Sequence, residues 1–186
     1  GAVHNDDPAA EKMWMESGSF WTQPLGENHI TAANGENSMI FLEILSGPYL
    51  VKPADEAFDG GERPINVGAR NIMWLGAEDA EWVADGGPEM AYLWGSVEDN
   101  EKNGSFVKLP SGYSGELSTS APLMRVVTIQ GKAKIQLSGE SKTHTLDPGS
   151  YFGSKGAAAH QLSCDSDEEC VLYLHTEGKY RLGASP

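Results

Sequence analysis

The sequence predicts an all-β chain that contains the same strand arrangement twice. Its 186 residues include 22 glycines and 10 prolines, which interrupt the chain at short intervals. The runs between them are rich in β-branched and aromatic residues, as in short strands. One motif, a glycine followed by aromatic residues, a histidine and an apolar run, occurs in two copies. The motif is too short to be a solenoid repeat, so it indicates two similar domains.

The two copies align without a gap at an offset of 131 positions. Such a match of residue types favours a tandem duplication over a chance similarity. The aligned pairs are Gly18 with Gly149, Phe20 with Tyr151, His29 with His160 and Met39 with Cys170.

The first copy is expected to contain strands over residues 12–15, 20–23 and 39–45. Gly18 permits the tight turn that enters the strand over residues 20–23. The Pro-Leu-Gly sequence at 24–26 then turns the chain again. His29 is thereby expected to begin the next strand with its side chain directed inward.

Residues 47–70 are expected to link the two domains, because this segment is rich in proline and glycine. A connection of this length without structure of its own is uncommon. We therefore expect it to lie on a domain surface, with residues 49–51 as an added strand. The expected boundaries are 1–46 for the first domain, 47–70 for the linker and 71–186 for the second domain.

The second copy is expected to be an antiparallel β domain, because its apolar and β-branched runs are separated by turn residues at short intervals. The strands are expected over residues 72–75, 91–95, 105–108, 124–129, 132–137, 143–146, 151–153 and 170–175.

The spacing of Gly18, Pro24, Gly26 and His29 resembles the second sequence motif of the cupin superfamily. The resemblance implies a tandem pair of jelly-roll barrels, a bicupin, and it makes His29 the candidate metal ligand. In cupins the other ligands come from an earlier motif, which would lie before residue 1. The first barrel is therefore expected to be N-terminally incomplete in this chain.

The chain as a whole resembles a bacterial bicupin family of uncharacterised function that is related to the zinc-binding cupin domain of anti-sigma factors. The resemblance implies a divalent transition metal (Zn, Fe, Mn or Ni) in the intact first barrel. Gln23, on the strand that leads to the turn, is a candidate donor in the same pocket. The stretches that carry the resemblance are residues 4–8, 18–29, 47–51 and 149–153.

The second copy lacks the residues that a cupin metal site needs. Ser118, Ser120 and Arg125 stand near the positions of the ligands of the earlier motif, and neither a hydroxyl nor a guanidinium is a plausible ligand for a transition metal. We therefore expect no metal in the second barrel. His160 is then a single histidine held by hydrogen bonds, or it forms a small anion pocket with those three residues.

The net charge of −14 argues against nucleic acid or an anionic membrane as a partner, since phosphate groups would be repelled. No apolar run is long enough to cross a bilayer. Cys164 and Cys170 flank an acidic loop, and they form either a disulfide or two buried free thiols. A cytoplasmic and a periplasmic location both stay open.

Three functions are compatible with these residues. The first is a metal-dependent protein that binds or converts a small molecule in the first barrel. The second is a non-catalytic zinc-binding sensor, and the third is a structural module that dimerises. A homodimer is expected, and the sequence leaves open whether the protein is an enzyme, because the cupin scaffold carries many activities.

Overall fold

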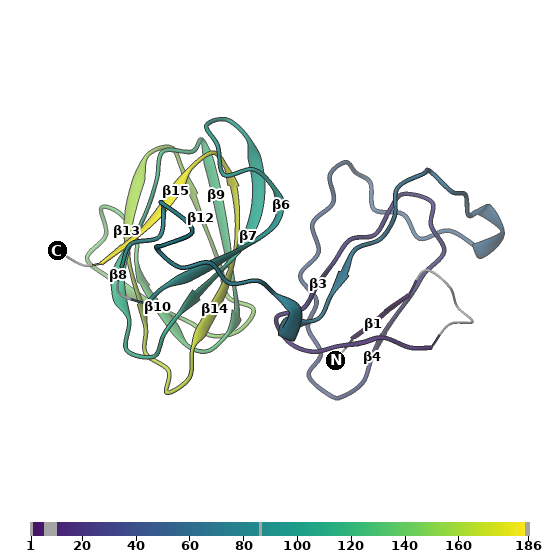
Figure 1. Cartoon of the computed structure of the whole chain (residues 1–186), viewed down its shortest axis with the longest axis horizontal. Helices are drawn as coiled ribbons and strands as arrows, with labels where there is room; N and C mark the ends of the chain where they lie inside the picture. Colours follow the sequence, from purple (N-terminus) through teal and green to yellow (C-terminus); the bar gives the residue numbers. More distant parts are fainter. Residues whose placement is uncertain (1, 6–10, 86, 185–186) are drawn as a thin grey trace. The chain divides into compact units, whose positions relative to one another are not determined.

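The computed structural model describes residues 2–5, 11–85 and 87–184. These residues divide into two compact units, Gly1–Ile72 (unit 1) and Met73–Pro186 (unit 2) (Figure 1). The helices in the described part of the chain are two short 3-10 turns, η1 (Ala54–Glu56) and η2 (Ala69–Asn71). The other regular elements are strands, so the predicted all-β class is confirmed.

Unit 2 consists of two five-stranded antiparallel sheets (Figure 1). The strand order is β11-β10-β13-β8-β15 in one sheet and β12-β9-β14-β7-β6 in the other. The strands are β6 (Glu89–Gly95), β7 (Lys102–Leu109), β8 (Ser114–Thr119), β9 (Leu123–Gln130), β10 (Ala133–Gln136), β11 (Thr143–Leu146), β12 (Tyr151–Lys155), β13 (Ala158–Cys164), β14 (Cys170–Glu177) and β15 (Tyr180–Ala184).

The eight strands β7 to β14 have the connectivity of a double-sheet jelly roll. Strands β7, β14, β9 and β12 are neighbours in one sheet, and β8, β13, β10 and β11 are neighbours in the other. Strands β6 and β15 extend the two sheets by one strand each. The jelly roll predicted for the second copy is therefore confirmed by the strand order itself.

The core of unit 2 lies between the two sheets, and the strand period of two decides which side chains enter it. On β14, Leu172 and Leu174 are fully buried and belong to the core cluster. They face Leu117 of β8 and Leu162 of β13, which are also buried. Each such leucine stabilises the fold by about 1.5–3 kcal/mol relative to an exposed side chain.

A disulfide joins Cys164, the last residue of β13, to Cys170, the first residue of β14. Both cysteines are buried. Of the two alternatives that the sequence left open, the structure has the disulfide. It closes the acidic loop between strands that belong to different sheets.

Unit 1 has shorter strands: β1 (Ala2–Asn5), β2 (Trp14–Met15), β3 (Phe20–Trp21), β4 (Ile30–Ala33) and β5 (Asn66–Val67). They form a sheet of order β2-β1-β4 and a pair β3-β5. Residues 49–51 form no strand and are exposed, so the added strand predicted there is wrong. Strand β5, near the end of the same segment, pairs with β3 instead.

The sheet β2-β1-β4 has the same register as β11-β10-β13 at the offset of 131. Strand β1 coincides with β10 at both ends under this offset. The sequence repeat is thus also a repeat of backbone pairing. The matching pairs include Ala2↔Met15 with Ala133↔Leu146, Ala2↔Ala33 with Ala133↔Cys164, and Asn5↔Ile30 with Gln136↔Gln161.

The apolar run over residues 39–45 is assigned no strand in this structure. At the same offset it corresponds to β14, the central strand of its sheet in unit 2. Large side chains of the run are exposed, including Met39 at 70% and Leu45 at 95%, whereas Cys170 and Leu172 of β14 are fully buried. A strand that is apolar on both faces requires neighbours, and the described residues of unit 1 pair none with this run.

Candidate functional site

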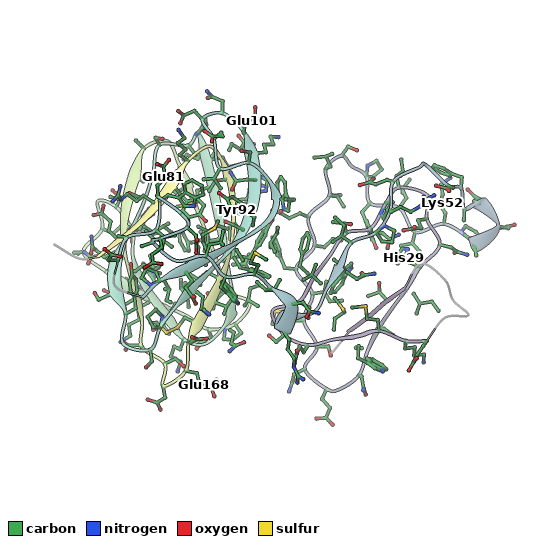
Figure 2. All side chains as sticks on the ribbon, in the orientation of Figure 1. His29, Lys52, Glu81, Tyr92, Glu101 and Glu168 are labelled. Atoms are coloured by element: carbon green, nitrogen blue, oxygen red, sulfur yellow. A yellow bond between two sulfur atoms is a disulfide. The ribbon has the colours of Figure 1, made fainter. Side chains whose placement is uncertain are left out.

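His29 lies between the turn at residues 24–26 and strand β4, and it is half-buried (Figure 2). The turn requires glycine at Gly26, which has φ +82°, and a Cβ there would lie 2.5 Å from the ring of Phe58. Nδ1 of His29 is 3.3 Å from the carbonyl oxygen of Glu27. A carbonyl accepts, so Nδ1 carries the proton in this contact and Nε2 of the neutral ring keeps its lone pair.

Gln23 contacts the same backbone carbonyl as His29. Its Nε2 donates to the oxygen of Glu27 at 3.4 Å. Its Oε1 is buried and has no hydrogen-bond partner within the described part of the chain. The two residues that the sequence assigned to the first site therefore contact the same carbonyl oxygen, and the acceptor atom Oε1 of Gln23 is not used among the described residues.

His29 has the chemistry of a metal ligand, because its Nδ1–H donates to a carbonyl and its Nε2 carries the lone pair of the neutral ring. A transition-metal site needs about three or four protein ligands. Among the described residues no group of three His, Cys, Asp or Glu side chains is arranged to hold a metal ion. The described residues therefore supply part of a ligand set, and no chemical step through a metal follows from them.

His160, the counterpart of His29 in unit 2, is 3% exposed and lies on β13. The backbone N–H of Ser138 donates to its Nδ1 at 3.0 Å. The proton of the neutral ring is then on Nε2, which is buried without a hydrogen-bond partner among the described residues. Burial lowers the pKa of His160, because an imidazolium would lose its hydration. Nε2 of His160 therefore carries a hydrogen atom, whereas Nε2 of His29 carries a lone pair.

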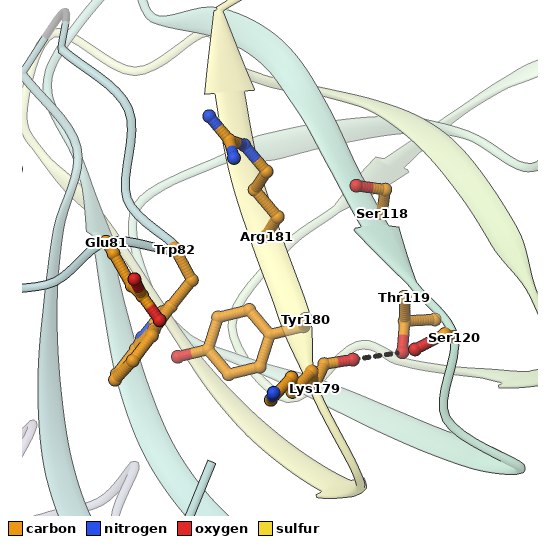
Figure 3. Close-up of a pocket in the computed structure, with 8 residues that line it drawn as sticks. All are labelled: Glu81, Trp82, Ser118, Thr119, Ser120, Lys179, Tyr180 and Arg181. Carbon is orange, nitrogen blue, oxygen red and sulfur yellow. Dashed lines mark hydrogen bonds between the residues drawn. The ribbon is translucent and has the colours of Figure 1, made fainter. Parts of the chain in front are cut away.

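Ser118 and Ser120 line an open pocket of about 440 Å³ on unit 2 (Figure 3). Its walls come from β8, from β15 and from the segment before β6. In Figure 3, the ring of Tyr180 extends from β15 toward Trp82, and Ser118 and Thr119 lie on the neighbouring strand β8. The lining residues are Glu81, Trp82, Ser118, Thr119, Ser120, Lys179, Tyr180 and Arg181.

The structure does not bring Arg125 or His160 into this pocket. Ser118 pairs with Ala159 and Leu117 pairs with His160, so Ser118 and His160 project from opposite faces of their sheet. Arg125 is exposed and lies on β9, in the other sheet. The arginine beside the two serines is Arg181.

The pocket contains both signs of charge. Lys179 Nζ lies 3.4 Å from Asp99 and 3.6 Å from Glu98, and its hydrogen bond to Asp99 is the main cause that raises its pKa. Tyr180 is buried and its hydroxyl is 2.8 Å from that of Ser105. Burial raises the pKa of Tyr180, so this hydroxyl is neutral near pH 7. Arg181 is exposed, and within the described residues it has no ion-pair partner.

The pocket residues of β15 were missed by the sequence analysis, which predicted no strand after residue 175. The alternation of Tyr180, Arg181 and Leu182, with the first and third buried, is the signal that indicates a strand there. In the described ranges, no helix combines the length and the apolar character that crossing a membrane requires.

Several solved structures, one of them a cupin domain, resemble this chain at low identity. The cupin domain of Cnp3 from Schizosaccharomyces pombe is 18% identical, with a TM-score of 0.41 over 48% of this chain and 60% of that one. The DMSP lyase DddQ from Ruegeria pomeroyi DSS-3 is 16% identical, with a TM-score of 0.46 over 59% and 58%. KdgF from Halomonas sp. is 17% identical, with a TM-score of 0.42 over 57% and 93%.

The chain spans less than two thirds of the Cnp3 and DddQ structures. These likenesses carry no argument about activity, and the jelly-roll assignment rests on the strand order of unit 2. No curated protein matches the sequence. The model of a family described as a domain of unknown function, DUF4437, matches residues 1–183, and the chain therefore belongs to this family.

Proposed function

We propose that this protein is a bicupin that binds a small molecule in its first barrel, at a site that includes His29. The observation that carries the proposal is the common register of β2-β1-β4 and β11-β10-β13. Under this register His29 has the position of His160, whose ring is buried inside the jelly roll and lies 5.7 Å from the ring of Phe152. His29 would then face the interior of the first barrel.

The different hydrogen bonds of the two histidines support a division of roles between the barrels. Nδ1 of His29 donates to the carbonyl of Glu27, so Nε2 carries the lone pair. That lone pair would bind a metal ion or accept a hydrogen bond from a ligand. His160 would have to lose its Nε2 proton before it could bind a metal there, and one histidine is too few for a site. We propose no metal for the second barrel.

The resident group that we propose for the first barrel is a divalent transition metal, Zn, Fe, Mn or Ni. Such an ion acts as a Lewis acid toward a coordinated ligand oxygen when it is bound. His29 would supply one ligand, and Gln23 would orient groups beside it through its buried Oε1. The other ligands would come from polypeptide outside the described residues.

The proposed domain arrangement is 1–46 for part of the first barrel, 47–70 for the linker and 71–186 for the second barrel. The exposed run over residues 39–45 supports an incomplete first barrel, because its counterpart β14 pairs with β7 on one side and β9 on the other. Strands equivalent to these two would cover the run. A homodimer that pairs two such runs is the competing arrangement.

Metal analysis of the natural full-length protein and of its His29→Ala variant tests the proposal. We expect the variant to bind the metal about tenfold or more weakly. Even residues that only hydrogen-bond to metal ligands change the metal affinity by about this factor when they are mutated. His144→Ala is the matched control, because His144 is a partly exposed histidine of unit 2. Equal metal content and affinity in the wild type and His29→Ala would remove His29 from the site.

A further inference from the structure

Glu43 is the one charged residue in the apolar run over residues 39–45. At the offset of 131 it corresponds to Leu174 of β14, which is fully buried in the core of unit 2. In the described structure Glu43 is half-buried, whereas Leu42 and Ile44 on either side of it are exposed. A carboxylate at a core position is costly unless a cation or hydrogen-bond donors meet it.

The register of unit 2 shows what lies at the level of Leu174 in a complete barrel. Leu174 pairs with Val126 of β9, and Val126 pairs with Phe152 of β12, so the three side chains form one row across the sheet. The ring of Phe152 contacts that of His160 on the facing sheet, with centroids 5.7 Å apart and an interplanar angle of 76°. Leu174 and His160 therefore belong to the same cross-section of the barrel.

The same cross-section in the first barrel would contain Glu43, Trp21 and His29, the counterparts of Leu174, Phe152 and His160. Facing sheets lie about 10 Å apart, and strands two places apart in a sheet are separated by a similar distance. An imidazole and a carboxylate that extend toward each other across such a gap leave room for one small group between them. Unit 2 fills this space with Leu174, and the aligned residue of unit 1 is Glu43.

We propose that Glu43 is the second polar group of the His29 site and that the two residues share a divalent cation. The inference rests on the proposed function, which places a binding site around His29. Carboxylate oxygen and imidazole nitrogen are both good ligands for divalent transition metals. The charge of Glu43 also disfavours an anionic ligand group on this wall of the barrel.

The test compares three variants of the natural full-length protein, with zinc ion alone as the probe in calorimetric titrations. Glu43→Gln keeps the shape of the side chain and removes its charge. Glu43→Leu installs the residue that unit 2 has at this position. Glu36→Gln is the control, because Glu36 is an exposed acid in the preceding loop. The melting temperature Tm of each protein without metal is measured in parallel.

We expect Glu43→Gln to bind zinc about tenfold or more weakly, with Glu36→Gln unchanged. Glu43→Leu should raise the Tm of the metal-free protein, because it replaces a buried charge by an apolar side chain that the fold accommodates. Unchanged zinc affinity in Glu43→Gln overturns the inference, even if Tm rises in Glu43→Leu. Unchanged Tm in Glu43→Leu also overturns it, since Glu43 would then lie outside the core.

The His29→Ala variant separates failure of this inference from failure of the proposed function. If zinc binding survives His29→Ala and is lost in Glu43→Gln, the cation site exists without His29, which overturns the sharing proposed here together with the function assigned to His29. If zinc binding is lost in His29→Ala and survives Glu43→Gln, the proposed function stands and only the role of Glu43 is wrong.

Discussion

The two aligned histidines differ in the hydrogen bond at Nδ1, and that bond decides which ring nitrogen carries the proton and which carries the lone pair. His29 donates from Nδ1 to the carbonyl of Glu27, whereas His160 accepts at Nδ1 from the N–H of Ser138. The spacing of glycine, proline and histidine predicted the position of His29, and the offset of 131 predicted that of His160. It could not predict the tautomers, because Ser138 is 22 residues from His160 and meets it only through the fold.

The depressed pKa of His160 predicts a pH dependence of stability. In the folded protein burial lowers this pKa below the ordinary value of 6.5, so the unfolded chain binds the proton more readily. The stabilising contribution is complete above pH 6.5 and is lost as the pH falls below that value toward the folded pKa.

Urea unfolding of the chain between pH 7.5 and pH 5 measures this dependence. As the pH is lowered, the free energy of unfolding of the wild type should decrease. The decrease should be less steep in His160→Gln. His144→Gln removes a partly exposed imidazole and serves as the control. Parallel curves for the wild type and His160→Gln would show that His160 does not titrate on unfolding.

At the scale of strands, the repeated register is the strongest regularity of the chain. The hydrophobic pattern predicted β9, β10, β11, β12 and β14 to within a few residues. It missed β8, in which serine, glycine and threonine dilute the pattern, and packing against neighbouring strands decides such segments. It also missed β15, whose short alternating pattern was overlooked. It also predicted a strand over residues 39–45, where the structure assigns none, because a strand forms only with a neighbouring strand.

The disulfide between β13 and β14 is expected to stabilise unit 2. It closes a short loop, with a sequence separation of 6 between the cysteines, which corresponds to about 2 kcal/mol from chain entropy. The double variant Cys164→Ser/Cys170→Ser should lose at least that amount, since both sites are buried.

Chemical denaturation of the oxidised protein and of the double variant measures the loss. Thiol titration of the unfolded wild type under non-reducing conditions is the control for the bond itself. A wild type with two titratable thiols, or a double variant as stable as the wild type, would contradict the expected contribution of the disulfide.

At the scale of the whole chain, the two units differ in how much apolar surface they bury. Unit 2 has a continuous core of leucine, valine and aromatic side chains between its sheets. In unit 1, Met15 is the one buried large hydrophobic residue among residues 11–72. A unit with so little buried apolar surface is marginal without further strands. The expectation of an incomplete first barrel, which was drawn from the sequence repeat, stays a prediction.

The central claim is that the chain carries one jelly-roll arrangement twice, with residues 39–46 in the role of β14. Amide hydrogen exchange of the natural full-length protein tests it most directly, because the amide hydrogens of a central strand exchange only when the whole domain unfolds. We predict that residues 39–46 are protected in the monomer to a degree similar to that of residues 170–177. Rapid exchange over 39–46, or protection that appears only in a dimer, would contradict the claim.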